Sequence, residues 1–247
     1  MKCELVIEQP ALKVVVCYIA VSRGENTRTF AQRFVDTWIA NPPGYPHRLL
    51  IICNGGRLPG YIEPIFKPLD CQFVLRQNDG GKDISAYQAV ADSTNADFLV
   101  CMGESVYFHR PGWLARMAKA REQLGPGMYG FFSSFMVMAH LNTTAFGCDP
   151  TFIRQYPQVD SNGARYEFEH GRTALWRRIV SWGGRAFFVT WDGVWERNDW
   201  RMPENILWRG DQSNLLVWCN HTERYYHGDA LLKFTWERNA NNPQRTE

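Results

Sequence analysis

Three short polar segments contain the side chains best suited to chemistry. The first is DGGKD at residues 79–83, in which two glycines permit close approach of the backbone to a ligand. Lys82 can neutralise a phosphate group, and Asp83 can accept hydrogen bonds from sugar hydroxyls or a base. The alternative interpretation is a glycine turn in which Asp83 caps a helix and Lys82 is solvated.

The second segment is Gly103-Glu104-Ser105, which directly follows an apolar run at residues 98–102. A buried strand that ends in a carboxylate places this charge at the tip of the strand, where ligands bind in open α/β sheets. Glu104 can bind a hard divalent cation through oxygen, usually together with substrate phosphates and water. A carboxylate at the sheet edge without any metal is the alternative.

The third segment is YEFEH at residues 166–170, which contains Glu167 and Glu169. It precedes a predicted helix at residues 173–182, so we expect both carboxylates in extended backbone, facing the same side, just before a helix N-terminus. In that position a carboxylate can act as a general base. It can equally do no more than complement the positive end of the helix dipole.

Histidines and tryptophans give weaker signals. His221 and His227 flank Arg224, and they can reach a diphosphate or a metal if the C-terminal segment folds back. His227 is therefore a candidate metal ligand. Eight of the ten tryptophans lie from Trp176 onward; aromatic faces stack on sugars and bases, but burial in a core is their commoner fate.

Length and composition restrict the class of protein. The chain has 247 residues, of which 45% are hydrophobic, and this fits one α/β domain or two small ones. The 27 basic and 25 acidic residues nearly balance, which gives no electrostatic argument for binding to nucleic acid or an anionic membrane. No apolar run approaches the ~20 residues of a membrane helix, and no signal sequence is evident, so we expect a cytoplasmic protein. Seven cysteines without a CxxC pair indicate buried thiols rather than a zinc site.

The elements that must position these side chains alternate in the first half of the chain. Apolar runs predict buried strands at residues 12–21, 48–53, 71–75 and 98–102. Between and after them, amphipathic patterns predict helices at residues 27–40, 61–66, 84–93 and 111–124. We expect Asp83 to cap the third of these helices and Pro111 to be the first residue of the last. This order is typical of a mostly parallel sheet with helices on both faces.

The second half is more irregular and rich in aromatic residues. It predicts strands at residues 128–138, 141–148 and 185–191, and helices at residues 149–156, 173–182 and 211–218. We therefore expect one domain over residues 1–237, followed by a polar tail at 238–247.

The order of these segments resembles that of family 2 glycosyltransferases with the GT-A fold, over roughly residues 13–191. Residues 79–87, DGGKDISAY, are similar to the N-x-G-x-D-I-G-A-Y turn of rhamnan-synthesis and related transferases, with Asp79 in place of the asparagine. The segment at 96–102 resembles the strand that carries the metal-binding D-x-D motif. The segment at 166–182 resembles the E-D-x-D-L helix, which begins at the catalytic base.

This resemblance implies a GT-A-like α/β fold in which residues 12–124 bind a nucleotide sugar and residues 125–237 bind the acceptor. It implies hexosyl transfer to a glycan or other hydroxyl acceptor, with inversion. The base is then Glu169 or Glu167, and Glu169 is preferred because it lies nearer the helix. The implied nucleotide-sugar-binding residues are Ala20, Val21, Ser22, Asn54, Asp79, Lys82, Asp83 and Gly103.

The sequence departs from the family at the metal motif, where only Glu104 can serve as a ligand. Either Mn²⁺ or Mg²⁺ binds through Glu104, with His227 as a further candidate, or cations such as Lys82 stabilise the departing phosphate. Two other classes remain open: a non-catalytic nucleotide- or carbohydrate-binding relative, and a phage-type transferase acting on modified nucleic-acid bases. An NAD-dependent oxidoreductase is disfavoured because no G-x-G-x-x-G follows the first strand.

Overall fold

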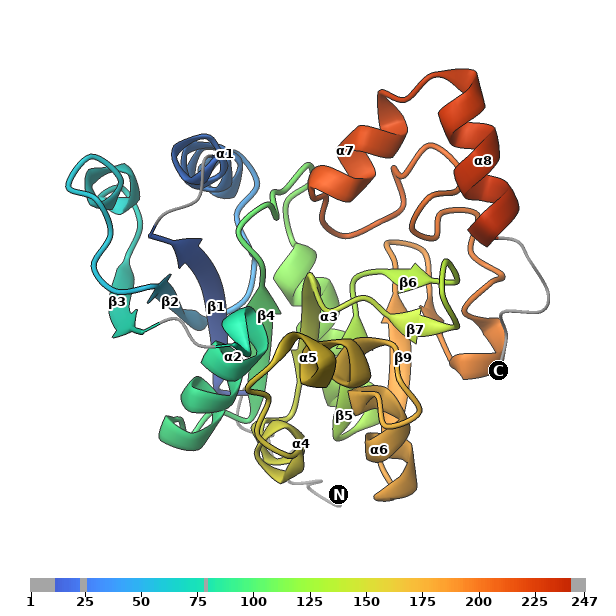
Figure 1. Cartoon of the computed structure of the whole chain (residues 1–247), viewed down its shortest axis with the longest axis horizontal. Helices are drawn as coiled ribbons and strands as arrows, with labels where there is room; N and C mark the ends of the chain where they lie inside the picture. The colour runs from blue at the N-terminus through green and yellow to red at the C-terminus, as the bar shows by residue number, and fades with distance from the viewer. Residues whose placement is uncertain (1–11, 23–25, 78–79, 241–247) are drawn as a thin grey trace, which may run out of the picture.

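The computed structural model describes residues 12–22, 26–77 and 80–240, and a mixed sheet of eight strands runs through them (Figure 1). In sheet order the strands are β10 (Val194–Trp195), β9 (Arg185–Val189), β5 (Gly127–Gly130), β8 (Ala145–Cys148), β4 (Phe98–Met102), β1 (Val14–Val21), β2 (His47–Asn54) and β3 (Cys71–Arg76). Strand β1 is parallel to β2 and β4, β2 is parallel to β3, and β5 is parallel to β9. Only β8 and β10 run against their neighbours among these strands. The predicted α/β class with a mostly parallel sheet is confirmed.

Helices cover both faces of the sheet. Helix α1 (Thr27–Ala40) and the 3-10 helix η1 (Glu63–Phe66) lie on one face, while α2 (Lys82–Ser93) and α4 (Pro150–Gln155) pack together on the other (Figure 1). The chain builds β1, β2 and β3 in one direction and then returns to β4 on the far side of β1. Because such crossovers are right-handed, reversing direction moves the helices to the opposite face. The reversal leaves a crevice beyond the carboxyl ends of β1 and β4, which is where ligands bind in sheets of this kind.

Stacked aromatic rings hold the segment after β4 in place. The ring of Phe108 stacks on Trp113 at 4.5 Å between ring centres and meets Phe34 of α1 at 5.5 Å. The hydroxyl of Tyr18 in β1 donates to the carbonyl oxygen of Glu104 at 2.6 Å. The backbone that carries Glu104 is therefore held by the hydrogen bond from Tyr18 at one side and by the packing of Phe108 at the other.

Two predicted helix starts are wrong. Gly81, rather than Asp83, is the N-cap of α2, and Asp83 lies in the first turn, where its carboxylate pairs with an arginine. Helix α3 (Trp113–Leu124) has Gly112 as its N-cap, so Pro111 precedes the helix. Gly112 adopts φ +82° and its N–H donates to the carbonyl of Pro42, and this contact sets the start of the helix.

The second half differs more from its prediction. The predicted strand at 128–138 divides into β5 and the short β6 (Ser133–Ser134), which pairs with β7 (His140–Leu141) outside the main sheet. The predicted strand at 141–148 divides likewise, and only β8 joins the sheet. No helix forms at residues 211–218. This segment turns, and its backbone pairs with distant residues through single β-bridges, from Leu215 to Thr190 and from Trp218 to Tyr107.

The segment expected to be extended before a helix is itself helical. Helix α5 (Asn162–Glu169) begins at Ser161, whose side chain accepts a hydrogen bond from the N–H of Ala164. The next helix, α6 (Leu175–Ser181), starts later than predicted. The serine cap therefore starts an additional helix before the one that the apolar pattern predicts. Both candidate carboxylates lie at the C-terminal end of this additional helix, α5.

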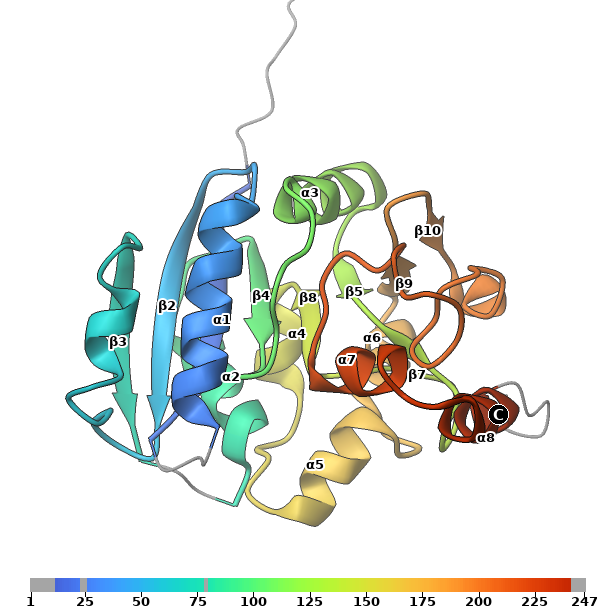
Figure 2. The ribbon, with the colours of Figure 1, turned by 90° about the horizontal axis from the view of Figure 1, so that it is seen from above.

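The C-terminal segment returns to the ligand edge of the sheet. After the short 3-10 helix η2 (Arg197–Asp199), helices α7 (Asn220–Tyr226) and α8 (Ala230–Ala240) lie at the end of the molecule that carries β6 and β7 (Figures 1 and 2). Ser105 donates to Asn220 at 2.9 Å, and Arg33 of α1 pairs with Glu223. Helix α8 also extends into the predicted polar tail. No helix in the described ranges has the length and apolar character needed to cross a membrane.

Two glycines before α2 allow the start of α5 to pack against it. A β-carbon on Gly80 would overlap the backbone of Asp160, and one on Gly81 would overlap the carbonyl oxygen of Val159. The glycine pair was expected to admit a ligand; in the structure it admits the chain segment that leads into α5.

We expect Gly81→Ala to lower the free energy of unfolding by about 1–3 kcal/mol, because the added methyl group must displace the backbone at Val159. Gly163→Ala is the matched control, since a β-carbon there meets no atom within 4 Å. Urea unfolding of both variants measures the difference. Equal stabilities would mean that the two segments can separate without cost.

Candidate active site

A cavity of about 340 Å³, here called the first cavity, opens beyond the carboxyl ends of β1 and β4. Its walls are formed by Ile19, Val21, Asn54, Lys82, Asp83, Gly103, Glu104 and Arg165. All of these except Ile19 and Arg165 were candidates from the sequence. The cavity therefore collects residues from β1, β2, the turn after β4, α2 and α5, as expected where the tips of neighbouring strands meet.

Among the described residues, three of the nucleotide-sugar and metal candidates do not line this cavity. Ala20 is buried in β1, and Ser22 uses its hydroxyl to bond the carbonyl of Gly55 at 2.9 Å. Asp79 lies outside the described residues. His227 ends α7 with an exposed side chain.

The first cavity contains buried acceptors that lack donors. Neither Oδ1 of Asn54 nor Oε2 of Glu104 has a hydrogen-bond partner among the described residues, although both atoms are shielded from solvent. An unpaired buried acceptor costs about 1–3 kcal/mol. Burial raises the pKa of Glu104, and the nearby charge of Asp83 raises it further. These groups favour a ligand that brings hydroxyl or N–H donors.

Two cations lie beside these acceptors. Lys82 follows the glycine pair with φ +50°, a conformation that costs energy for a residue with a β-carbon. Arg165 of α5 pairs with Oδ1 of Asp83, at 2.8 Å from Nη2 and 3.0 Å from Nε. Burial raises the pKa of Asp83, and Arg165 opposes this effect. Sequence reasoning missed Arg165; its place one helical turn before Glu169 would have been the signal if α5 had been predicted.

A second cavity, also of about 340 Å³, lies on the other side of the Asp83–Arg165 pair, which lines both. Its remaining walls are formed by Ser134, Met136, Val137, His140, Asn142, Thr143, Thr144, Glu169, His170, Trp208 and His221. Among these, Glu169, His221 and the tryptophans as a group drew attention in the sequence.

Only one of the two candidate carboxylates faces the second cavity. Glu169 lines it, whereas Glu167 accepts a hydrogen bond from Thr173 at 3.2 Å. Residues two apart on an α-helix point about 200° from each other. The expectation that both carboxylates share a side is therefore wrong, because the segment is helical rather than extended.

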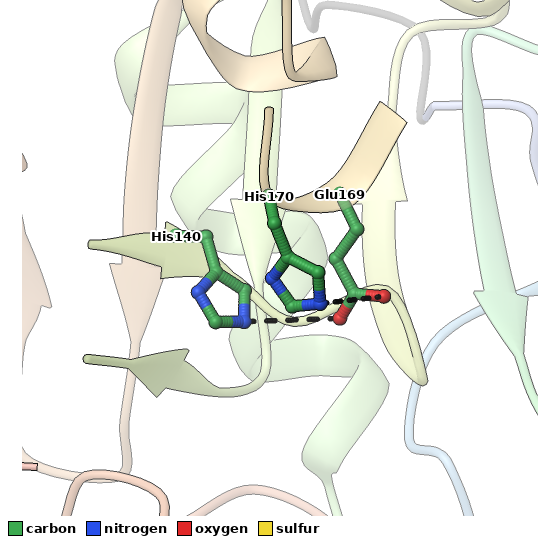
Figure 3. A group of neighbouring side chains, drawn as sticks. All are labelled: His140, Glu169 and His170. Carbon is green, nitrogen blue, oxygen red and sulfur yellow. Dashed lines mark ion pairs between the residues drawn. The ribbon is translucent and has the colours of Figure 1, made fainter. Parts of the chain in front are cut away.

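Glu169 is anchored by one oxygen. Its Oε1 accepts hydrogen bonds from Nδ2 of Asn142 at 2.8 Å and from the N–H of Thr143 at 3.2 Å. Its Oε2 accepts none from the described residues and lies 3.7 Å from Nε2 of His170 (Figure 3). One oxygen thus fixes the carboxylate while the other is available to a ligand.

Two histidines surround this carboxylate. His140 is 2% exposed, and its Nδ1 lies 2.8 Å from the carbonyl oxygen of Met138, which requires the proton to be on Nδ1. Burial lowers the pKa of His140 to about 4; the neighbouring His170 lowers it too, and Glu169 raises it. His140, Glu169 and His170 each offer a donor atom, and these atoms all lie within 4.8 Å of one another, a group that could hold a metal ion (Figure 3). The two sequence candidates for a metal ligand, Glu104 and His227, do not belong to this group.

No protein-family model matches this sequence, and no curated protein sequence matches it. Several solved structures are similar in fold. The mannosyltransferase PcManGT from Pyrobaculum calidifontis, in complex with GDP-Man and Mn²⁺, matches 61% of this chain and 50% of its own, with 10% identity and a TM-score of 0.43. The galactosyltransferase LgtC, with donor and acceptor sugar analogues, matches 62% of this chain and 64% of its own, with 9% identity and a TM-score of 0.45. TarS from S. aureus matches 64% of this chain and 32% of its own, with 10% identity and a TM-score of 0.47. The chain thus spans only part of each of these proteins.

We expect the metal-free protein to lose stability as the pH falls from about 6.5 to about 4, the interval between the unfolded and folded pKa values of His140. In this interval the unfolded state binds a proton that the folded state excludes, so acid favours unfolding. The loss amounts to roughly 3 kcal/mol at most. Urea unfolding across this pH range, with chelator present, measures it. The slope should decrease in His140→Asn, and an unchanged slope would show that other groups are responsible.

Proposed function

We propose that this protein is a glycosyltransferase that moves a sugar from a nucleotide-sugar donor to a hydroxyl group of an acceptor. The observation that carries the proposal is the pair of cavities on either side of Asp83 and Arg165, one rich in acceptors and cations and the other containing the anchored carboxylate of Glu169. Donor binding and proton removal thereby have separate but adjoining places. The similarity of residues 79–87 to a glycosyltransferase turn agrees with this division.

The first cavity suits the donor. Lys82, the first residue of α2, can pair with the diphosphate, since the ammonium group of a lysine is a good partner for phosphate. Glu104 and Asn54 can accept hydrogen bonds from the ribose or the sugar, which would satisfy their unpaired buried oxygens. Val21 and Gly103 complete the walls at the tips of β1 and β4. Asp79 remains a candidate from its place in the sequence.

The second cavity suits the acceptor. Oε2 of Glu169 can take the proton from an acceptor hydroxyl while Asn142 and Thr143 hold Oε1. The hydroxyl oxygen then attacks the anomeric carbon from the side opposite the nucleotide, so the bond to the diphosphate breaks with inversion. The contact of Glu167 with Thr173, and its position two residues before Glu169 on the same helix, support Glu169 as the base instead.

A divalent cation at the D-x-D position fits the described residues poorly. Glu104 is the one carboxylate there, and its neighbour Asp83 is already paired with Arg165. Neither residue belongs to the group of described side chains that could hold a metal. We therefore assign stabilisation of the departing phosphate to Lys82 and Arg165, which can supply positive charge without a metal.

We expect one member of a panel of UDP-, GDP-, dTDP- and CMP-sugars to stabilise the protein against heat without added Mn²⁺. At ~100 times its dissociation constant, a ligand adds about 2.7 kcal/mol to the free energy of unfolding. The shift should decrease in Lys82→Ala and in Glu104→Gln, while the exposed Lys119→Ala serves as control. A shift that requires Mn²⁺ would overturn the assignment of phosphate stabilisation to Lys82 and Arg165. The absence of any shift across the panel would count against the donor site.

We expect Glu169→Gln to lower kcat by about 10²–10⁴-fold, because glutamine keeps the shape of the side chain but cannot take a proton. The matched control is Glu167→Gln on the same helix, for which kcat should be almost unchanged. The measurement is release of nucleoside diphosphate in the presence of a panel of saccharide acceptors. Donor binding should be the same in both variants. Full activity in Glu169→Gln would exclude it as the base, and donor binding without turnover in the wild type would favour a non-catalytic binding protein.

A further inference from the structure

The cluster of His140, Glu169 and His170 lies in the wall of the second cavity, away from the position where the family places its metal motif. His140 comes from β7, Glu169 ends α5, and His170 follows directly (Figure 3). The two imidazoles meet edge to face with 4.2 Å between ring centres. Three potential ligands thus converge from two distant parts of the chain.

The first observation is an unpaired buried nitrogen. Nε2 of His140 is shielded from solvent, has no hydrogen-bond partner among the described residues, and lies 3.8 Å from Oε1 of Glu169. Its other nitrogen, Nδ1, donates to the carbonyl oxygen of Met138. Metal-binding histidines usually donate their second ring nitrogen to a carbonyl or a carboxylate in this way, which fixes the ring and directs the lone pair.

The second observation concerns spacing. The distances of 3.8 Å and 3.7 Å from the carboxylate oxygens of Glu169 to Nε2 of His140 and of His170 are too long for hydrogen bonds. Two ligands that each lie 2.0–2.1 Å from a tetrahedral ion are roughly 3.3 Å apart. The three donor atoms all lie within 4.8 Å of one another, so they must move inward to bind one ion, but no ligand has to come from another part of the fold.

The third observation is the support around the ligands. Asn142 and Thr143 hold Glu169, and neither ring nitrogen of His170 makes a hydrogen bond within the described part of the chain. Asn142 thereby orients a ligand without binding the ion itself. Supporting contacts of this kind are typical of metal sites, and their loss weakens metal binding about 10–100-fold.

We propose that His140, Glu169 and His170 form a binding site for a divalent transition-metal ion of the zinc class, with its remaining coordination open to the second cavity. Two imidazoles and one carboxylate favour Zn²⁺ and similar ions over Mg²⁺ or Ca²⁺, which prefer oxygen. Three protein ligands with an open position are typical of zinc sites that also bind water or a substrate oxygen.

This site goes beyond the proposed function and does not depend on it, because the metal alone is the ligand. The two are connected through Glu169, since a carboxylate bound to a metal is withdrawn from service as a base. A hydroxyl of an acceptor in the second cavity has the chemistry to occupy the open position.

The test uses the full chain, freed of metal with a chelator and titrated with Zn²⁺ in a calorimeter. We expect one ion per chain and a higher unfolding temperature. His170→Ala should weaken binding by tenfold or more, and Asn142→Ala should weaken it 10–100-fold. His227→Ala, which changes a sequence-predicted ligand outside the cluster, should leave affinity unchanged. His140→Gln is the variant most prone to misfolding, because His140 is buried. If His140→Gln does not fold, His170→Ala and Asn142→Ala still decide the test.

Substitution with Co²⁺ identifies the ligands in the wild-type protein. Visible bands typical of nitrogen and oxygen ligands, lost in His170→Ala, would support the site. A sulfur-to-metal charge-transfer band would assign the ion to cysteine and overturn the proposal. The proposal would also be overturned if the wild-type protein bound no metal, or if His170→Ala bound it with unchanged affinity. If the wild-type protein binds no zinc but is stabilised by a nucleotide sugar, only this inference is wrong. If it binds zinc but no nucleotide sugar stabilises it, only the proposed function is wrong.

Discussion

The ion pair between Asp83 and Arg165 joins the two halves of the molecule at the point where chemistry is proposed. Asp83 belongs to the first turn of α2, and Arg165 to the middle of α5. The side chains of Arg165 and Asp83 are 30% and 23% exposed, so removing one partner would leave the other as an unpaired charge that water reaches only in part. The pair requires the middle of α5 to come within reach of the first turn of α2, and Gly80 and Gly81 allow the segment before α5 to approach because they have no side chains. Asp83 and Arg165 line both cavities, so this contact forms the wall that the two cavities share.

Donor binding and catalysis are thereby assigned to different kinds of structure. The first cavity is built at the tips of buried parallel strands, whose positions are fixed by the core on both faces of the sheet. The second cavity is built from the end of a short helix and from the chain around β7. Rigid strand tips suit a site that must hold a large, polar ligand. The α-helical geometry of α5 then selects Glu169 over Glu167, since only one of them can point into the cavity.

Positive charge in the proposed site comes from the side chains of Lys82 and Arg165. Lys82 and Arg165 stand near the unpaired acceptors of Asn54 and Glu104, so anionic and hydroxyl groups of one ligand have separate partners. A metal site of a different composition, rich in imidazole, is proposed on the acceptor side. Carboxylates select hard cations and imidazoles select softer ones, so the two imidazoles of the proposed site favour an ion of the zinc class.

The sequence by itself determined β1 to β4, α1 and most of the first cavity, because buried strands and amphipathic helices have local periodic patterns. Glu104 could be predicted because strand ends meet at one edge of the sheet, and Lys82 and Asp83 from the glycine turn that precedes a helix, while Val21, Asn54 and Gly103 were implied by the family resemblance. Only the tertiary structure decided the rest. Arg165 reaches Asp83 across 82 positions of sequence, and His140 meets Glu169 from another element. Such convergence leaves no periodic signal, and a single serine cap at Ser161 was enough to turn an expected extended segment into the helix that aims Glu169.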